Sequence, residues 1–186
     1  MSTLWFLNTL IGRRVIVERP ENSSKASIPF FSLYCTDIKG KRFDFSALKG
    51  KKTIIVNTAC ECGFTKQFYE LENFYRNFRD QINIIAFPCN DFGNQDPGTS
   101  DEISNFCKGK FDISFPIMSK IKIKGREKDQ VYSWLTSKKM NGWNDIAPHW
   151  NFCKYLVDEH GELQLFTNPV VKPSDEKFLT KILLNN

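Results

Sequence analysis

One cysteine lies where a thiol could react. Cys62 falls in a stretch of small residues, Asn57 to Phe64, between an apolar β-branched run at 53–56 and a segment with aromatic residues at helical spacing. The pattern predicts a buried strand, a turn and an amphipathic helix, with Cys62 just ahead of the helix N-terminus. Unpaired backbone N–H groups and the helix dipole favour an anion there, and the thiolate is the reactive form of cysteine. Position alone fits equally well a small buried apolar residue.

A second loop is expected beside Cys62. The apolar run Ile82 to Phe87 follows the helix, so the chain predicts a βαβ unit with parallel strands and a right-handed crossover. Function in such sheets gathers at the carboxyl ends of the strands. The loop that follows, Pro88 to Gly98, is longer than a plain turn needs, which is typical of a functional loop.

The rest of the pattern predicts an α/β domain with hairpins on either side of this unit. The expected elements are a hairpin formed by 30–35 and 42–45, a helical turn ended by Gly50, a helix with Thr99 and Glu102 as its capping box, an extended segment at 115–123, a helix at 129–137, a hairpin formed by 154–157 and 163–166, and a last helix capped by Ser174.

Composition indicates one globular domain. The 186 residues, 41% of them hydrophobic, can bury one substantial core, whereas a second domain would need more. The formal charge is +5, but 26 basic and 21 acidic residues are interspersed, unlike a nucleic-acid-binding arm. No stretch is apolar for long enough to span a bilayer. We therefore expect no nucleic acid partner and no stable membrane insertion.

The cysteines indicate working thiols in a reducing compartment. Six are present, at irregular spacing and without a secretory signal, which argues against a disulfide framework. There is no Cys-x-x-Cys pair, and His149 and His160 lie far from the pair formed by Cys60 and Cys62, which argues against zinc. We expect no metal and no cofactor, with one or two reactive thiols and the others in the core.

The N-terminus differs from the remaining chain, and we place residues 1–26 in an extension and 27–186 in the domain. The apolar patch from Leu4 to Ile11 is interrupted by polar residues, and up to Val17 there are two arginines, several hydroxyls and no acid. This composition is typical of a mitochondrial or plastid targeting segment. A ragged extension that packs onto a cytoplasmic domain is the alternative. Residues 19–25 are expected to form a polar linker.

Three loops, taken together, resemble the signature segments of the glutathione peroxidase family: 57–65, 86–98 and 150–152. The similarity runs from Phe30 to Leu183. It implies a thioredoxin-like fold, with a central mixed sheet flanked by helices. The peroxidatic residue of the family, selenocysteine or cysteine, falls on Cys62. Its other active-site residues fall on Gln95, Trp150 and Asn151.

The residue types suit the implied chemistry. A thiolate attacks one oxygen of a peroxide and expels the other, so the site must stabilise charge on a departing oxygen. The side chains of Gln95, Trp150 and Asn151 all carry N–H donors, and a donor aimed at developing charge can contribute about 10²-fold in rate. Individually, Trp150 could be a core residue and Gln95 could bond loop backbone. Their joint placement beside Cys62 favours an active site.

The resemblance also assigns a second thiol. Attack leaves a sulfenic acid, which another cysteine can trap as a disulfide, and Cys107 matches the resolving cysteine of the thioredoxin-dependent branch. On a helix it would need local unwinding to reach Cys62; the alternative is a buried helical cysteine. Cys60 departs from the usual serine and could divert the sulfenic acid. Cys89 is structural in the family, and Asp91 replaces the usual glutamine, placing an acid near the site.

The sequence therefore predicts a thiol peroxidase that reduces hydrogen peroxide and organic or lipid hydroperoxides. The expected reductant is thioredoxin or a related dithiol protein in preference to glutathione. The resemblance also implies a monomer, because the segment between Trp134 and Trp150 lacks the longer insertion of tetrameric members of the family. The alternative is a non-catalytic peroxide sensor or redox relay that oxidises a partner protein. A structural thioredoxin-like binding module is third, because it leaves Gln95, Trp150 and Asn151 unexplained.

Overall fold

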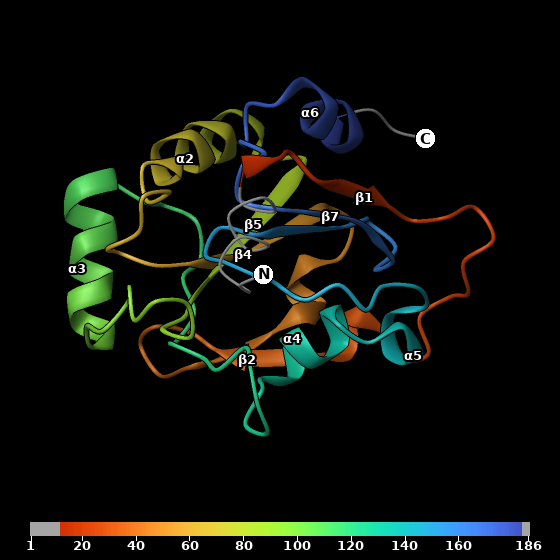
Figure 1. Cartoon of the computed structure of the whole chain (residues 1–186), viewed down its shortest axis with the longest axis horizontal. Helices are drawn as coiled ribbons and strands as arrows, with labels where there is room; N and C mark the ends of the chain where they lie inside the picture. Colours follow the sequence, from red (N-terminus) through yellow and green to blue (C-terminus); the bar gives the residue numbers. More distant parts are fainter. Residues whose placement is uncertain (1–11, 184–186) are drawn as a thin grey trace, which may run out of the picture.

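A computed structural model describes residues 12–183, and it contains a five-stranded mixed sheet in the order β1-β7-β6-β4-β5 (Figure 1). The parallel pair is β4 with β5, and the other neighbours are antiparallel. The strands are β1 (Ile16–Glu18), β4 (Lys52–Thr58), β5 (Ile82–Pro88), β6 (Lys154–Val157) and β7 (Leu163–Thr167). The predicted βαβ unit and mixed central sheet are confirmed.

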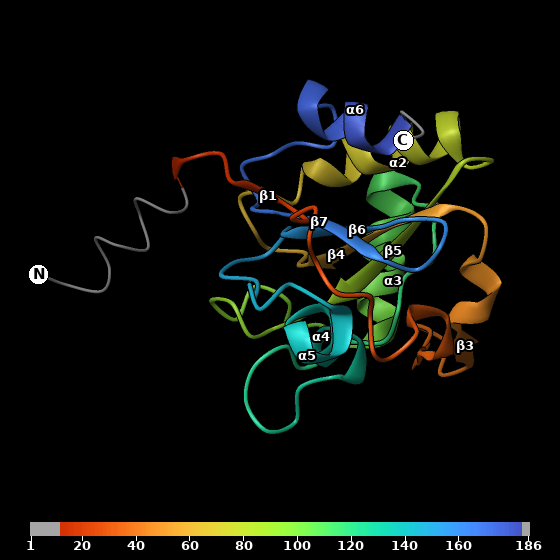
Figure 2. The ribbon, with the colours of Figure 1, turned by 90° about the vertical axis from the view of Figure 1, so that its right-hand side faces the viewer.

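Helices cover both faces of this sheet (Figure 2). On one face lie α2 (Gln67–Phe78) and α6 (Glu176–Leu183); on the other lie α4 (Gln130–Leu135) and α5 (Lys138–Asn141). The helix α3 (Ser100–Phe111) stands at the side of the molecule next to α2 (Figure 1). A separate hairpin joins β2 (Tyr34–Thr36) to β3 (Arg42–Asp44), and the short 3-10 helices η1 (Phe30–Ser32) and η2 (Phe45–Leu48) flank it.

The apolar run of β4 is buried on both faces. Ile54 and Val56 belong to the core cluster that includes Phe68 of α2 and Phe178 of α6, whereas Ile55 belongs to the cluster on the α4 side. A strand covered by helices on both sides needs a continuous apolar sequence. That requirement explains why the run before Cys62 is unbroken.

Most predicted elements are present, with two differences. The capping box of Thr99 and Glu102 begins α3 as expected. The last helix begins at Glu176, and Asp175 accepts the Lys177 N–H, while the expected cap Ser174 donates to a glutamate of α2. The segment 115–123 makes only isolated bridges, two of which run along β5 and the residue that follows it.

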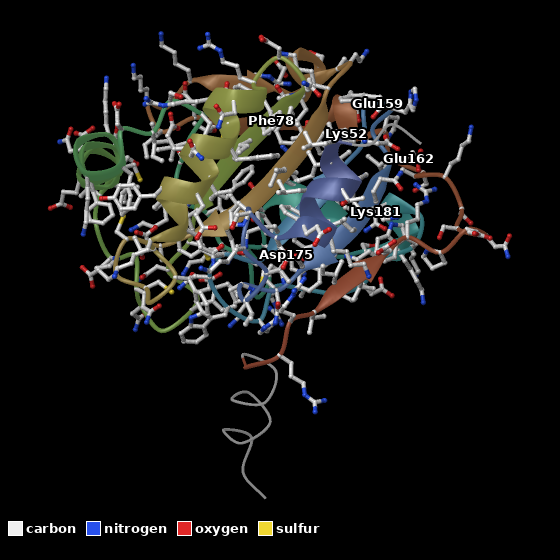
Figure 3. All side chains as sticks on the ribbon, turned by 90° about the horizontal axis from the view of Figure 1, so that it is seen from above. Lys52, Phe78, Glu159, Glu162, Asp175 and Lys181 are labelled. Carbon is white, nitrogen blue, oxygen red and sulfur yellow. The ribbon has the colours of Figure 1, made fainter. Side chains whose placement is uncertain are left out.

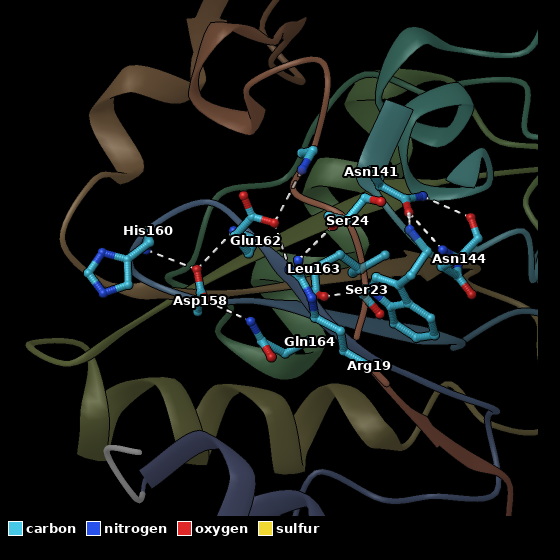
Figure 4. Close-up of polar contacts among 12 residues, drawn as sticks. Arg19, Ser23, Ser24, Asn141, Asn144, Asp158, His160, Glu162, Leu163 and Gln164 are labelled. Atoms are coloured by element: carbon cyan, nitrogen blue, oxygen red, sulfur yellow. Dashed lines mark hydrogen bonds and ion pairs between the residues drawn. The ribbon is translucent and has the colours of Figure 1, made fainter. Parts of the chain in front are cut away.

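Part of the expected extension belongs to the sheet. Ile16–Glu18 form β1 and pair with β7, and Arg19 forms an ion pair with Glu162 at an N–O distance of 2.6 Å. Glu162 also accepts the Ala26 N–H at 3.3 Å, so the segment expected to be a linker is fastened to the β6–β7 hairpin (Figure 4). The apolar patch on which the targeting prediction rests lies outside the described residues. That prediction stays a prediction.

The helix α6 lies beside β1 and is joined to it by ion pairs (Figure 3). Glu18 of β1 forms ion pairs with Lys177 and Lys181, and Asp175 pairs with Arg14. Partly exposed pairs of this kind contribute about 0–1 kcal/mol each. They orient β1 and α6 relative to each other, while burial of Phe178 supplies the apolar contact.

Candidate active site

The thiol of Cys62 lies in the turn that leads from β4 to α2. The Phe64 N–H donates to its sulfur at 3.4 Å, and the Cys62 N–H donates to the Thr65 hydroxyl at 3.0 Å. That hydroxyl donates to the Ala59 carbonyl at 2.9 Å. The Cys62 residue is 8% exposed, between the exposed Glu61 and Gly63. A thiol with a little solvent access, at the amino end of a twelve-residue helix, matches the position predicted for it.

The loop at 89–98 is bonded directly to this turn. The Gln95 carbonyl accepts the Glu61 N–H at 2.9 Å, and the Asp96 carboxylate accepts the Cys60 N–H at 3.0 Å. The two residues before Cys62, Cys60 and Glu61, are therefore both held by this one loop. The predicted meeting of the two loops at the carboxyl edge of β4 and β5 is confirmed.

The third loop, 149–152, joins the same edge through Asn57. The Asn57 amide donates to the Trp150 carbonyl at 2.9 Å, and the Asn57 carbonyl accepts the Phe152 N–H at 2.6 Å. Phe152 has φ of 65°, a left-handed conformation that is costly for a bulky residue and persists only when its surroundings impose it. These bonds, together with full burial of Phe152, fix the loop.

Two of the three predicted donors are available to a ligand. The fully buried Asn151 donates both of its side-chain N–H groups, to Gln95 Oε1 at 3.1 Å and to the Phe92 carbonyl at 3.3 Å. Across residues 12–183, nothing accepts a hydrogen bond from Gln95 Nε2 or from Trp150 Nε1, and both side chains are partly exposed. Asn151 therefore fixes the amide of Gln95 with its oxygen inward.

The ring of Trp150 rests on a glycine. A side chain at Gly93 would approach the Trp150 ring to 3.3 Å, and Gly93 has φ of 68°, which a residue with a side chain rarely adopts. The Phe92 ring is tilted against the indole, with centroids 6.4 Å apart. The lack of a side chain at Gly93 thus leaves room for the indole beside the loop that carries Gln95.

Cys107 contacts a different thiol from the expected one. It is 1% exposed in α3, and its thiol interacts with that of Cys60, whereas the Cys62 sulfur accepts the Phe64 N–H. All six cysteines are unbridged. The Cys107 thiol, burial and the Asp96 carboxylate raise the pKa of the Cys60 thiol, so Cys60 is protonated at neutral pH. Cys60 is consequently a poor first nucleophile for a peroxide.

Asp91 does not act as the free acid expected near the site. Its carboxylate accepts the N–H groups of Ile123 at 2.6 Å and Lys124 at 3.0 Å, and Lys122 lies 3.5 Å away. Burial works to raise the pKa of Asp91, but these donors and Lys122 lower it overall. Its charge is therefore used to tie two segments together.

Two further buried charges were missed by sequence reasoning. Asp96 is 1% exposed beside the Cys60 thiol, and burial raises its pKa. Lys154, fully buried, donates to the carbonyls of Phe152 at 2.9 Å and Val171 at 2.7 Å, and burial lowers its pKa to about 7. Lys154 begins a strand whose other residues are apolar and do not alternate with polar ones. A lysine in a strand without that alternation is the sequence feature that could have indicated its burial.

Other features of the described chain carry less chemistry. No cluster of three or more histidine, cysteine and acidic side chains in residues 12–183 could hold a metal ion. In the same residues, every helix is too short or too polar to cross a membrane.

The fold and site define a thioredoxin-like oxidoreductase with a thiol at the carboxyl edge of the sheet. The structure resembles a thioredoxin family protein of Chlorobium tepidum, a thiol:disulfide interchange protein, with a TM-score of 0.56, 15% identity, and 87% and 99% of the two chains covered. At that identity the likeness shows the fold alone. The crystal structure of T. cruzi GPX1 has a TM-score of 0.63 and 29% identity, and covers 82% of this chain and 95% of that one.

Sequence comparison identifies the family. The glutathione peroxidase family model matches residues 30–136. Glutathione peroxidase-like peroxiredoxin 2 of Saccharomyces cerevisiae is 43% identical over 146 residues, covering 78% of this chain and 90% of the relative. A probable phospholipid hydroperoxide glutathione peroxidase of Helianthus annuus is 41% identical, with 79% and 83% covered. The chain belongs to the glutathione peroxidase family, and it is a thiol peroxidase.

Proposed function

We propose that Cys62 is the peroxidatic cysteine of this enzyme and that Gln95 and Trp150 bind the peroxide oxygens. The main support is that the side-chain N–H groups of Gln95 and Trp150 have no acceptor within residues 12–183, and that both residues lie on loops bonded to the β4 end and the turn of Cys62. The Cys62 thiolate attacks one oxygen of the peroxide, the O–O bond breaks, and the donors stabilise the departing oxygen until it takes up a proton. Asn151 is a positioning residue, because its N–H groups are already bonded.

Substitution of Cys62 tests this assignment. Cys62→Ser is expected to abolish peroxide consumption in an assay with a dithiol reductant, because the hydroxyl is not ionised at neutral pH. Cys35→Ala is the matched control: Cys35 is also buried, but burial and nearby acids raise its pKa to about 12, and it contacts Met118. Retained activity in Cys62→Ser would refute the assignment. A non-catalytic sensor would instead be oxidised once per chain and stop.

The reductant is proposed to be thioredoxin or a related dithiol protein. Its support is two further thiols, Cys60 two residues from the predicted peroxidatic one and Cys107 beside Cys60, because an internal disulfide is a substrate for a dithiol. Steady-state rates with thioredoxin and its reductase, compared with glutathione and its reductase, provide the test. We expect turnover with the former, on hydrogen peroxide and on lipid hydroperoxides. Efficient turnover with glutathione alone would contradict the proposal.

The chain is further proposed to act as a monomer without stable membrane insertion. The support is the short connection between α5 and β6, which leaves little chain for a subunit contact. Sedimentation equilibrium over a range of protein concentrations measures the mass directly. A concentration-independent dimer or tetramer would overturn this part of the proposal.

A further inference from the structure

The turn of Cys62 holds a second thiol that faces a third. Cys60 lies two residues earlier in the same turn, and its side chain interacts with Cys107 of α3 and with the Asp96 carboxylate. The Asp96 carboxylate accepts the Cys60 N–H at 3.0 Å, and the backbone N–H of Asp96 donates to the Asn90 side-chain oxygen in its own loop at 2.8 Å. Cys60 also packs against the apolar cluster that contains Cys107, and it lines one cavity with Ile103 and Phe106 of α3. Cys60 and Cys107 are therefore neighbours before any movement of α3.

The two thiols differ in their access to solvent. Cys60 is partly exposed and lines a cavity of about 430 Å³ between its turn and α3, together with Asp96, Ile103 and Phe106. Cys107 is 1% exposed and does not line that cavity. A protein thiol approaching from solvent would reach the Cys60 sulfur first.

We propose that Cys60 is a redox relay: it takes the oxidation from Cys62, passes it to Cys107, and is the sulfur that the dithiol reductant attacks. This inference rests on the peroxidatic role proposed for Cys62. The resting oxidised form is then a Cys60–Cys107 disulfide, formed with α3 in place.

The steps balance without another co-reactant. Hydroperoxide converts the Cys62 thiol to a sulfenic acid and is itself reduced to an alcohol or water. The Cys60 sulfur displaces that hydroxyl, forming a Cys60–Cys62 disulfide, and the Cys60 proton leaves with the hydroxyl as water. Cys107 then attacks the Cys60 sulfur and releases its proton, the bond between Cys60 and Cys62 breaks, and Cys62 departs as a thiolate. A dithiol protein finally reduces the Cys60–Cys107 disulfide, supplies two electrons, and becomes a disulfide itself.

The spacing permits the first bond. Two peptide units separate Cys60 from Cys62, so their Cα atoms lie at most about 7.3 Å apart, and a disulfide takes Cα separations of roughly 4.4–6.8 Å. The buried Asp96 carboxylate beside the Cys60 thiol can accept its proton as the sulfur attacks. The Phe64 N–H that donates to Cys62 favours that sulfur as the leaving thiolate in the second step.

Peptide mapping after one turnover tests the relay. The reduced full chain receives one equivalent of hydroperoxide, is alkylated, and is digested after lysine and glutamate; cleavage after Glu61 separates Cys60 from Cys62. We expect a link between the peptides 53–61 and 103–108. A link from 62–66 to 103–108 alone would overturn the relay.

Variants separate this inference from the proposed function. Cys60→Ser should lose the linked peptides and most dithiol-dependent turnover, while Cys62 still forms one sulfenic acid per chain, trapped by a dimedone probe. Cys35→Ala should behave as wild type. Unchanged turnover in Cys60→Ser refutes the relay and leaves the peroxidase intact. A Cys60–Cys107 link formed by peroxide in Cys62→Ser would instead refute the role of Cys62.

The attacked sulfur can be identified independently. A thioredoxin whose second active-site cysteine is replaced by serine forms a stable mixed disulfide with the oxidised chain. We expect that bond on Cys60, in the peptide 53–61. A mixed disulfide on Cys107 in the peptide 103–108 would refute the order of attack.

Discussion

At the scale of single residues, the proposed site contains one residue that orients a donor, Asn151, and others whose donors are free to bind a peroxide. Asn151 donates its two side-chain N–H groups to Gln95 and to the Phe92 carbonyl, so it can affect a bound peroxide only by orienting Gln95. The sequence indicated which side chains meet, because each lies in a family segment. It could not indicate that Asn151 is occupied, since its partners are 56 and 59 residues away in the chain.

Gln95→Ala and Asn151→Ala are expected to differ in stability more than in rate. Both should lower the rate constant for peroxide reduction by about 10- to 100-fold, because Gln95→Ala removes a donor and Asn151→Ala removes the group that orients it. Gln95→Ala frees one Asn151 N–H at a partly exposed position that water can reach, whereas Asn151→Ala leaves the Phe92 carbonyl of a buried bond without its partner, at a cost of about 1–3 kcal/mol. Stopped-flow oxidation and urea unfolding measure the two effects. Equal losses of stability would contradict the separation of roles.

At the scale of elements, α3 is held at its first turn. Thr99 and Glu102 bond each other's backbone N–H groups, and Lys120 donates to the carbonyls of the three residues before Thr99, at 3.0, 3.1 and 2.6 Å. The capping box was predictable because it is local in sequence. The lysine clamp was not, because Lys120 comes from a segment that makes only isolated bridges.

Loss of the cap should loosen the helix that carries Cys107. Thr99→Ala is expected to lower the free energy of unfolding by about 1 kcal/mol and to speed amide exchange in the first turn of α3. Ser100→Ala, one residue into the helix, is the matched control with little expected effect. Denaturant titration and hydrogen exchange give the measurements; equal shifts in the two variants would show that the cap is not responsible.

At the scale of the whole molecule, a buried lysine links stability to pH. The pKa of Lys154 is lowered to about 7 by burial, below its ordinary value of 10.5. Below pH 7 the amine is charged in the folded and the unfolded chain alike. Above pH 7 the folded chain releases this proton while the unfolded chain keeps it, so the free energy of unfolding rises with pH.

The rise should be visible between about pH 7 and 8.5, with a slope of up to about 1.4 kcal/mol per pH unit. Above that window the thiols of the unfolded chain lose protons, whereas burial raises the pKa of Cys89 to about 12 and of Cys153 to about 11 in the folded chain. This difference lowers the free energy of unfolding as pH rises, and so opposes the effect of Lys154. Lys154→Met is expected to flatten the profile in urea unfolding. A slope identical to that of the wild type would assign the effect to other groups.

The sequence predicted the strands that carry a pattern of their own or belong to a hairpin, and it missed β1. The seven-residue β4 and β5 carry continuous apolar runs, and their pattern is plain. The three-residue β1 has no such pattern of its own, and its neighbouring arginines indicated a targeting segment. Its place depends on β7, about 150 residues later in the chain.

The pairing of β1 sets a limit on maturation. The Arg13 carbonyl accepts a bond from Asn168, and Ile16–Glu18 cover the outer rim of β7. If the predicted targeting segment is removed, a cut ahead of Arg13 would keep this pairing. A cut after Glu18 would remove β1 and leave the edge of β7 open to pairing with other chains.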